Sequence, residues 1–375
     1  MTNRFEQLAA PGIRRLAPYV PGKPPEELER ELGITGSIKL ASNENPLGPG
    51  PQARAAMTAA IAGVGMYPDG SGHALRSRLA HRHQVAIGQV TLGNGSNDVL
   101  VLLAATFLAP GLDAVYSQYA FAVYPIAVQA AGAGARVAAA HPTDRAMPLG
   151  HDPDAMLAMV GPKTRIVFLA NPNNPTGTWL TEPELRSLLR AVPPEVIVVL
   201  DEAYHEYSQE AGVPDATAWL ADHPNLVVVR TFSKAYGLAG LRVGYALSHP
   251  DVAELLNRVR QPFNVSVVGL AAAAAALDDS EHVAATVALN RQGLQRLREG
   301  LGGLGIGVLP SAANFVLCDV GRPAAAVNDA LLRRGVIVRP VANYGLPNHL
   351  RISTGTADQN ERVIAAMRAV LAVGT

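Results

Sequence analysis

The chain has 375 residues, of which 49% are hydrophobic and 17% are charged, so it exceeds the usual size of one domain and general disorder is excluded. Its formal net charge of zero excludes an extended basic surface for nucleic acid or for an anionic membrane. The single cysteine, Cys318, can form neither an internal disulfide nor a multi-thiolate zinc site, which is typical of a protein of the reducing cytoplasm.

Three regions of the chain differ in their pattern. Residues 1–39 carry no apolar signal core, and no apolar run elsewhere is long enough to cross a membrane. Residues 40–258 contain the strongest strand patterns, whereas residues 259–375 open with an alanine-rich helical stretch. We therefore expect a large domain at 40–258, a small α+β domain at 259–375, and an N-terminal arm at 1–39 that joins the small domain.

Buried strands alternate with helices in the large domain. The runs 165–170 (RIVFLA), 196–204 (VIVVLDEAY) and 226–232 (LVVVRTF) are largely apolar without alternation, which is typical of strands covered on both faces. The segment 95–108 (GSNDVLVLLAATFL) begins like a helix, and Thr181 is placed to cap another helix. These patterns predict an α/β fold in which ligands bind at the carboxyl ends of the strands.

Polar side chains collect where these strands end. Asp201 follows five apolar residues, so we expect its carboxylate to be partly buried and to need a cation or a strong donor. Asn174 lies in NPNNPTG, where two prolines and a glycine fix a turn and direct the amide. Tyr204 can bring a phenol to the same place, and it can equally be a packing aromatic residue with a satisfied hydroxyl.

A phosphate site is predicted beside these residues. The glycines of GNGSNDV (93–99) allow close backbone approach, and the start of the next helix presents free N–H groups to an anion. Ser233 and Arg242 can add a hydroxyl and a bidentate cation. Such glycine-rich turns are also common without phosphate, so the prediction depends on the motifs that follow it in the chain.

One ligand satisfies these groups together. Pyridoxal phosphate (PLP) combines a monophosphate, a basic ring nitrogen, a phenolic oxygen and an aldehyde, and the aldehyde suits Lys234. Asp201 is expected to keep the ring nitrogen protonated, so that the ring accepts electrons as the substrate's α-proton leaves. Lys234, once displaced by substrate, is expected to move that proton. We expect no metal, because the ten histidines show no metal-ligand spacing.

Five motifs resemble those of the fold-type I PLP-dependent aminotransferases: ASNENPLGP, NPNNPTG, LDEAYHEY, TFSKAYGLAGLRVGY and LRISTGT. More narrowly, LAPYVPGKPPEELERELG joined to IKLASNENPLGP is similar to the histidinol-phosphate aminotransferase family. The resemblance covers nearly the whole chain. It implies a mixed, mostly parallel sheet covered by helices, a smaller α+β domain, and a homodimer with active sites shared between its subunits.

The resemblance also assigns cofactor contacts residue by residue. Lys234 would form the internal aldimine, Asp201 would pair with the ring nitrogen, and Tyr204 would act with Asn174 at the ring oxygen. The phosphate would be held by Ser96, Asn97, Thr231, Ser233 and Arg242. Tyr119 would stack on the ring, although Ser117 and Gln118 stand where many relatives carry a proline. Tyr67 would reach the phosphate of the neighbouring subunit.

Four further residues are expected to bind substrate. Arg351 would clamp the carboxylate of glutamate, and Tyr19, Asn43 and Arg339 would help an anion pocket that accepts either this carboxylate or the substrate phosphate. Both arginines can also be ordinary surface or ion-pair residues, and Tyr19 can be a hydrophobic anchor for the arm. His205 is expected to have no catalytic role, because its neighbours YHEY suggest a strand end that meets solvent.

The resemblance implies a ping-pong transfer of the amine between L-histidinol phosphate and 2-oxoglutarate, which yields imidazole acetol phosphate and L-glutamate. An aromatic amino-acid aminotransferase is an alternative on the same scaffold, because substrate breadth depends on pocket shape. A decarboxylase acting on an amino-acid phosphate is a second alternative. A PLP-binding regulator of transcription is a third, although such proteins normally append a basic DNA-binding module.

Overall fold

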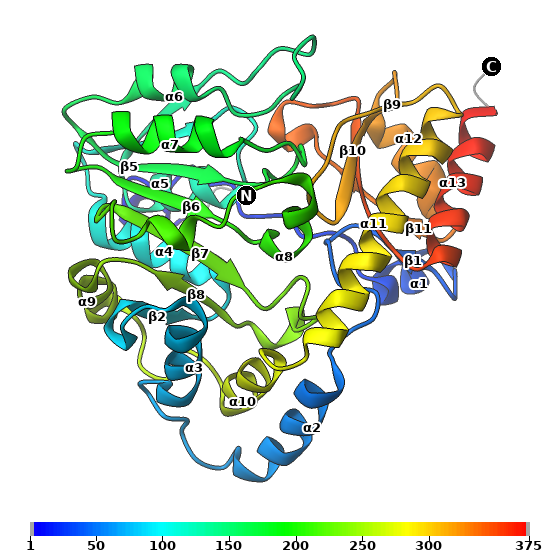
Figure 1. The fold of residues 1–375 in the computed structure, drawn as a ribbon. Helices are drawn as coiled ribbons and strands as arrows, with labels where there is room; N and C mark the ends of the chain where they lie inside the picture. Colours follow the sequence, from blue (N-terminus) through cyan, green and yellow to red (C-terminus); the bar gives the residue numbers. More distant parts are fainter. Residues whose placement is uncertain (1–3, 373–375) are drawn as a thin grey trace.

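A seven-stranded sheet forms the centre of the larger part of the molecule (Figure 1). The structure is a computed structural model that describes residues 4–372. The spatial order of the strands is β2 (Val90–Gly93), β8 (Gly244–Leu247), β7 (Leu226–Thr231), β6 (Ile197–Asp201), β5 (Thr164–Ala170), β3 (Asp113–Ser117) and β4 (Gly134–Ala138). Strand β8 runs antiparallel to both of its neighbours, and the other pairs are parallel. The predicted mixed, mostly parallel sheet is therefore confirmed.

Helices cover both faces of this sheet, because successive strand residues point to opposite sides. Val199 packs in one apolar cluster with α4 (Ser96–Phe107), α5 (Val123–Ala130) and α9 (Pro250–Val259). Val198 and Leu200 pack on the other side, in a cluster that includes residues of the following helices: α2 (Pro51–Ala60), α3 (His73–His83), α6 (Pro153–Met159), α7 (Glu182–Ala191) and α10 (Val267–Ala276). Neighbouring residues of β6 therefore face different environments.

The smaller part of the molecule is built on an antiparallel sheet of four strands. Its order is β12 (Arg339–Pro340), β13 (His349–Ser353), β10 (Phe315–Asp319) and β9 (Gly307–Val308). Its apolar core includes residues of α11 (Ser280–Gly302), α12 (Ala324–Leu332) and α13 (Ala357–Ala372). Cys318 is fully buried in this core, where the sequence pattern places it as a packing residue.

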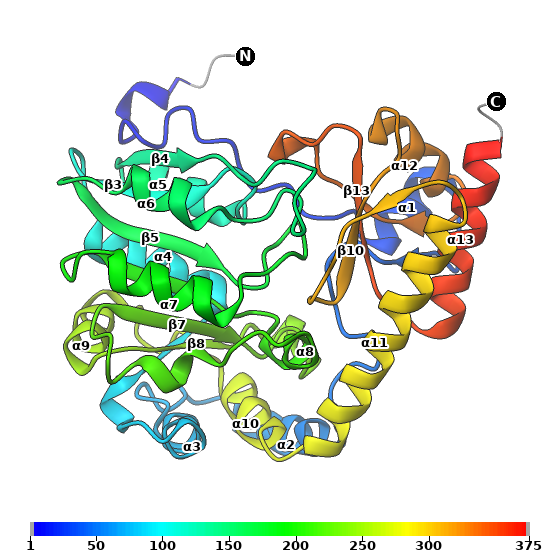
Figure 2. The same ribbon diagram turned by 45° about the horizontal axis from the view of Figure 1, so that its top comes forward.

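The N-terminal segment is divided between the two parts. Figure 2 shows that it begins beside β4 and crosses to the smaller part, where α1 (Pro25–Leu32) lies. The segment packs closely on the large part near Gly12, because a Cβ atom at this position would lie 2.0 Å from the Gln129 carbonyl oxygen. Further along, β1 (Ile38–Lys39) pairs in parallel with β11 (Val336–Ile337) of the smaller part.

The expected boundary at residue 259 differs from the packing of the alanine-rich stretch. Helix α10 buries Ala272, Ala273 and Ala276 in the cluster of the large sheet, and it packs closely on α2. Only with α11, from Ser280, does the chain pack into the smaller part. Small alanine side chains allow helices to approach closely, and their pattern alone does not reveal which partner they approach.

The strand predicted to reach Tyr204 ends at Asp201, and the short helix α8 (His205–Ser208) follows. His205 is only 6% exposed, so the expectation that YHEY meets solvent is wrong. The remaining single-turn helices are η1 (Glu6–Leu8), η2 (Ile61–Gly63), η3 (Ile87–Gln89), η4 (Gln209–Ala211), η5 (Ala216–Trp219), η6 (Ala239–Leu241) and η7 (Ala342–Tyr344).

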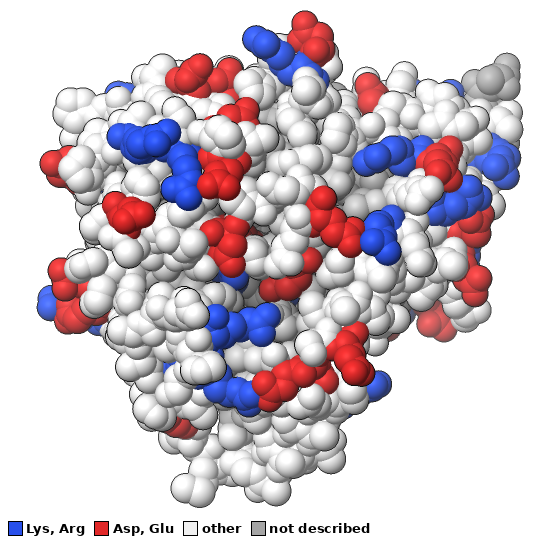
Figure 3. Space-filling model, viewed as in Figure 1, with Lys and Arg blue, Asp and Glu red and all other residues white. Residues whose placement is uncertain are grey.

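The surface charges, the helix lengths and the arrangement of His, Cys, Asp and Glu side chains bear on which partners the chain can bind. Positive and negative side chains are interspersed over the face shown in Figure 3. Within residues 4–372, none of the helices is both long enough and apolar enough to span a bilayer. In the same range, no group of three or more His, Cys, Asp or Glu side chains is arranged to hold a metal ion.

Candidate active site

A cavity of about 760 Å³, counted out to the solvent at its mouth, opens at the carboxyl ends of β5, β6 and β7. Twelve of the residues proposed from the sequence line it: Tyr19, Asn43, Ser96, Asn97, Asn174, Asp201, Tyr204, Thr231, Ser233, Lys234, Arg242 and Arg351. They come from the N-terminal segment, from both parts of the molecule, and from loops that follow four strands. The parallel sheet brings the strand ends together, as expected for an α/β fold.

One end of the cavity is built to receive an anion. Helix α4 begins at Ser96, and Gly95 before it adopts a φ of +87°, which favours glycine. A Cβ atom at Gly95 would also lie 2.2 Å from Nη2 of Arg242. Asp98 accepts the backbone N–H of Asn94 at 2.7 Å, so this carboxylate turns back from the helix start. The first N–H groups of α4 and the Arg242 guanidinium therefore converge on one place.

The loop after β7 adds hydroxyls to this end. The backbone N–H of Ser233 donates to Thr231 Oγ1 at 3.1 Å, and Arg242 Nη1 donates to Ser233 Oγ at 3.3 Å. Arg242 itself has a φ of +55°, and its Nη1 also donates to the Ala239 carbonyl. The guanidinium is thus held by its own loop in a position where it can pair with a phosphate.

Lys234 lies next to this loop and is partly buried. Its Nζ donates to the Ser42 carbonyl oxygen at 3.1 Å and lies 5.8 Å from the centre of the Tyr204 ring. Burial, followed by the nearby charge of Arg351, lowers the pKa of Lys234 to about 8. The amine can therefore lose its proton near neutral pH, which nucleophilic and base chemistry both require.

Asp201 is 5% exposed at the end of β6 and faces the side of the sheet covered by α4 and α5. Its Oδ1 accepts the Ala203 N–H at 3.2 Å, and its Oδ2 accepts the hydroxyl of Tyr124 at 3.0 Å. Burial raises the pKa of Asp201 to about 6, against the opposing effects of these two donors and of Lys234. The carboxylate is thus incompletely compensated by the chain, and it borders the cavity.

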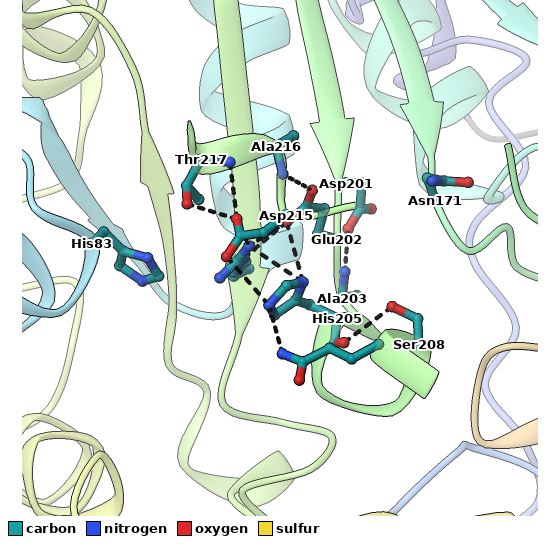
Figure 4. Close-up of polar contacts among 12 residues, drawn as sticks. His83, Asn171, Asp201, Glu202, Ala203, His205, Ser208, Asp215, Ala216 and Thr217 are labelled. Carbon is teal, nitrogen blue, oxygen red and sulfur yellow. Dashed lines mark hydrogen bonds and ion pairs between the residues drawn. The ribbon is translucent and has the colours of Figure 1, made fainter. Parts of the chain in front are cut away.

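Glu202, the next residue, belongs to a closed ionic cluster on the other face (Figure 4). Arg230 donates to Glu202 Oε2 from both Nε, at 2.9 Å, and Nη2, at 2.6 Å. The same Nη2 lies 2.6 Å from Asp215 Oδ1. Burial acts to lower the pKa of Arg230, but the nearby carboxylates outweigh it, so the pKa is raised. Glu202 makes the largest contribution to this increase. His205 lies against this cluster, and burial followed by Arg230 lowers the pKa of its imidazole to about 3.

A second set of contacts joins the two parts of the molecule across the cavity. Arg351, on β13, donates at 2.6 Å to Asn174 Oδ1 and also at 2.6 Å to the Ala41 carbonyl. Its buried Nε has no hydrogen-bond partner among residues 4–372. Asn43, with a φ of +56°, donates from Nδ2 to the Tyr204 hydroxyl at 2.8 Å. A guanidinium with an unused buried donor is suited to bind a carboxylate.

Three predicted residues do not line this cavity. Tyr119 accepts the Gln118 side-chain amide at its hydroxyl and packs beside a separate apolar cluster. Arg339 lies with Tyr19 on a neighbouring cavity, where it donates to the Val20 carbonyl and its guanidinium carbon is 5.6 Å from the Tyr19 ring centre. Tyr67 is 82% exposed and stacks on Phe263 with ring centroids 4.8 Å apart.

Other residues of the site were missed by sequence reasoning. Phe121 lines the cavity, two positions after the tyrosine expected there, and Ser42 offers the carbonyl that holds Lys234. The segment SQYAF offers two aromatic residues, Tyr119 and Phe121, and the sequence alone does not show which of them reaches the cavity. Tyr124 lies in the first turn of α5, and no local sequence pattern indicated that its hydroxyl reaches Asp201.

Comparisons with known proteins identify the family of the chain. The pattern of the family "Aminotransferase class I and II" matches residues 35–367. A "Histidinol-phosphate aminotransferase 2" from Pseudomonas fluorescens is 56% identical over 376 residues and covers 100% of both chains. Another of this name, from Pseudomonas aeruginosa, is 55% identical and covers 98% of this chain and 99% of its own.

A solved structure gives the same fold. The histidinol-phosphate aminotransferase from Sinorhizobium meliloti, crystallised in complex with pyridoxal-5'-phosphate, superposes with a TM-score of 0.89 at 31% identity, covering 98% of each chain. The fold class expected from the sequence motifs, fold-type I, is therefore confirmed. From its sequence along nearly the whole length and from its fold, the chain belongs to the class I and II aminotransferases.

Proposed function

We propose that this chain is a PLP-dependent aminotransferase that exchanges the amine of L-histidinol phosphate with 2-oxoglutarate to give imidazole acetol phosphate and L-glutamate. The main observation is the cavity itself, where an amine of lowered pKa, a buried carboxylate and an anion-binding helix start lie on one wall. The substrate is inferred from relatives of this name that match the chain over its full length.

The residues present fit the cofactor. The anion end offers the N–H groups of α4, the side chains of Thr231 and Ser233, and Arg242, which together suit a phosphate monoester. Ser96 and Asn97 would contribute from the first turn of α4. Asp201 would face the protonated ring nitrogen. This positive charge would stabilise the buried carboxylate, whose partners within the chain do not offset its burial. Phe121, in the place expected of Tyr119, would lie against the ring.

When bound, PLP supplies an aldehyde for amine exchange and a ring that accepts electrons. Lys234 would bind the aldehyde and, once released, carry the substrate's α-proton, for which its lowered pKa is suited. Tyr204 and Asn174 would hydrogen-bond the ring oxygen. Arg351 would bind the substrate carboxylate through the guanidinium edge that now contacts Asn174. Tyr19 and Asn43, on the cavity wall, would orient the substrate.

We further propose that two copies of the chain form the working unit. Tyr67 and Phe263 make an exposed aromatic pair, with 82% and 44% of their surfaces accessible. Residues so exposed are unsuited to a role inside their own subunit, and a partner's cavity would bury them. Arg339 would contact the substrate phosphate from the neighbouring cavity. Mixing inactive Lys234→Ala and Tyr67→Ala subunits should restore part of the activity, because one hybrid site keeps both residues.

The decisive experiment is a substrate panel on the purified holoenzyme. We expect kcat/KM for histidinol phosphate to exceed that for phenylalanine or tyrosine by at least about tenfold, because substrates without a phosphate leave the proposed contact with Arg339 unmade. Glutamate should change the absorption of the bound cofactor, and the keto acid should reverse the change. A preference for phenylalanine would indicate an aromatic aminotransferase. A cofactor absorption that does not change when glutamate is added would contradict any aminotransferase activity.

A further inference from the structure

Tyr124 is a fully buried residue of α5 that no substrate could touch, yet its hydroxyl donates to Asp201 Oδ2 at 3.0 Å. Its ring is fixed on two sides. It stacks on Phe168 with centroids 4.9 Å apart and planes 13° apart, and it meets the edge of Phe121 at 5.9 Å and 89°. The hydroxyl therefore has one place to point, because rotation of the side chain is blocked by packing.

The two oxygens of Asp201 each receive one donor from the chain. The Ala203 N–H binds Oδ1, and the Tyr124 hydroxyl binds Oδ2. Two donors on different oxygens fix the plane of the carboxylate, and they leave further lone pairs for the cavity side. Burial first, and the Asp201 charge next, raise the pKa of Tyr124 well above its ordinary value, so this phenol remains a donor.

Phe121 and Tyr124 come from the same segment at the start of α5. Phe121 lines the cavity, and Tyr124 passes behind it to the carboxylate at the end of β6. This short segment therefore supplies an aromatic side chain to the cavity wall and a hydrogen-bond donor to the Asp201 carboxylate. The arrangement links an interior tyrosine to the reacting centre through one hydrogen bond.

We propose that Tyr124 is a positioning residue that fixes the orientation of the Asp201 carboxylate and, by donating to it, favours its charged form opposite the cofactor's ring nitrogen. The inference rests on the proposed role of Asp201. Without the hydroxyl, the carboxylate binds a proton more tightly, so the proton shared with the ring nitrogen moves toward Asp201. The ring then withdraws electrons less strongly, and α-proton removal slows.

The test compares Tyr124→Phe, Asp201→Asn and the double variant in the full-length protein. We expect Tyr124→Phe to weaken PLP binding to the cofactor-free protein and to reduce kcat, each by about 10- to 100-fold, with little change in KM for glutamate. The pH midpoint of the cofactor's absorbance change should rise, because a less electron-withdrawing ring makes the attached nitrogen more basic. In the Asp201→Asn background, Tyr124→Phe should add less than about twofold.

Tyr116→Phe is the matched control, since Tyr116 belongs to the same apolar cluster but lines the neighbouring cavity. Equal effects of Tyr124→Phe and Tyr116→Phe on PLP binding and pH midpoint would overturn the inference, as would additive losses in the double variant. If Asp201→Asn itself left binding and midpoint unchanged, the proposed role of Asp201 would fall first. If Tyr124→Phe does not fold, fluorotyrosine at 124, a stronger donor, must lower the pH midpoint; a rise or no shift overturns the inference.

Discussion

Asp201 and Glu202 are neighbouring carboxylates at the end of one strand, and both are at most 5% exposed. Their surroundings differ because successive strand residues point to opposite faces. Glu202 faces Arg230 and the Ala216 N–H, so its carboxylate has a cation of its own, although burial still raises its pKa to about 7. Asp201 receives only a phenol and one backbone N–H, and it borders an open cavity.

The difference separates a carboxylate that is paired with a cation of the chain from one that has no such pair. A buried ion pair with good geometry holds secondary-structure elements in place, and here Arg230 ties β7 to the residue after β6. A buried carboxylate without a cation of its own destabilises the empty protein, and it is retained where a ligand completes it. Changes on the two faces should therefore produce different kinds of damage.

The largest effect on activity should follow loss of the Lys234 amine. Lys234→Ala should lower kcat/KM by at least about 1,000-fold, because nucleophile and base are removed together. Borohydride treatment followed by mass spectrometry should no longer attach the cofactor to the protein. The exposed Lys163 supplies a control, since Lys163→Ala should leave both results unchanged. Residual covalent attachment in Lys234→Ala would place the nucleophile elsewhere.

The largest effect on stability should follow loss of the cation on the closed face. Arg230→Met should reduce the free energy of unfolding by about 3–5 kcal/mol, because it leaves the Glu202 carboxylate buried without a cation. The double variant Arg230→Met, Glu202→Leu should recover most of this loss, since Asp215 retains 47% side-chain exposure. Urea unfolding of the cofactor-free proteins measures both. A double variant as unstable as the single one would contradict the pairing.

Asp201→Asn should have the opposite effect on the cofactor-free protein. The folded-state pKa of about 6 lies above the ordinary 3.8, so the folded chain binds more protons than the unfolded chain between these values. Stability contributed by this group therefore falls as pH rises from about 4 to 6. Above that window, the free energy of unfolding of Asp201→Asn should exceed that of the wild type by about 2–3 kcal/mol. Near pH 4 the two proteins should differ little in stability. Equal stability at pH 8 would contradict the burial argument.

The smallest effect is expected at Tyr119. Its hydroxyl accepts a hydrogen bond from the neighbouring Gln118 side chain, and Tyr119 does not line the cavity. Tyr119→Ala should therefore weaken PLP binding by less than about threefold, whereas Phe121→Ala should weaken it by about tenfold or more through lost ring contact. Cofactor titration of the two variants compares them directly. A larger loss in Tyr119→Ala than in Phe121→Ala would identify Tyr119 as the stacking residue.

Sequence reasoning placed the strand-end residues well and the helical ones poorly. Asp201 is the last residue of β6, and Asn174 and Lys234 lie in the loops that follow β5 and β7; neighbouring parallel strands bring these ends to one edge of the sheet. Phe121 and Tyr124 instead depend on how α5 crosses the sheet, which no local pattern records. The same limit explains α10, since an alanine face fits more than one neighbour.

Arg351 reaches from β13 to Asn174 and to the carbonyl of Ala41, so it connects three separate segments before any substrate arrives. An incoming carboxylate exchanges one set of bonds for another and gains only the difference between them. Such an exchange keeps the affinity for each amino acid moderate. Turnover benefits, because the departing keto acid leaves behind an arginine whose former contacts are ready to re-form.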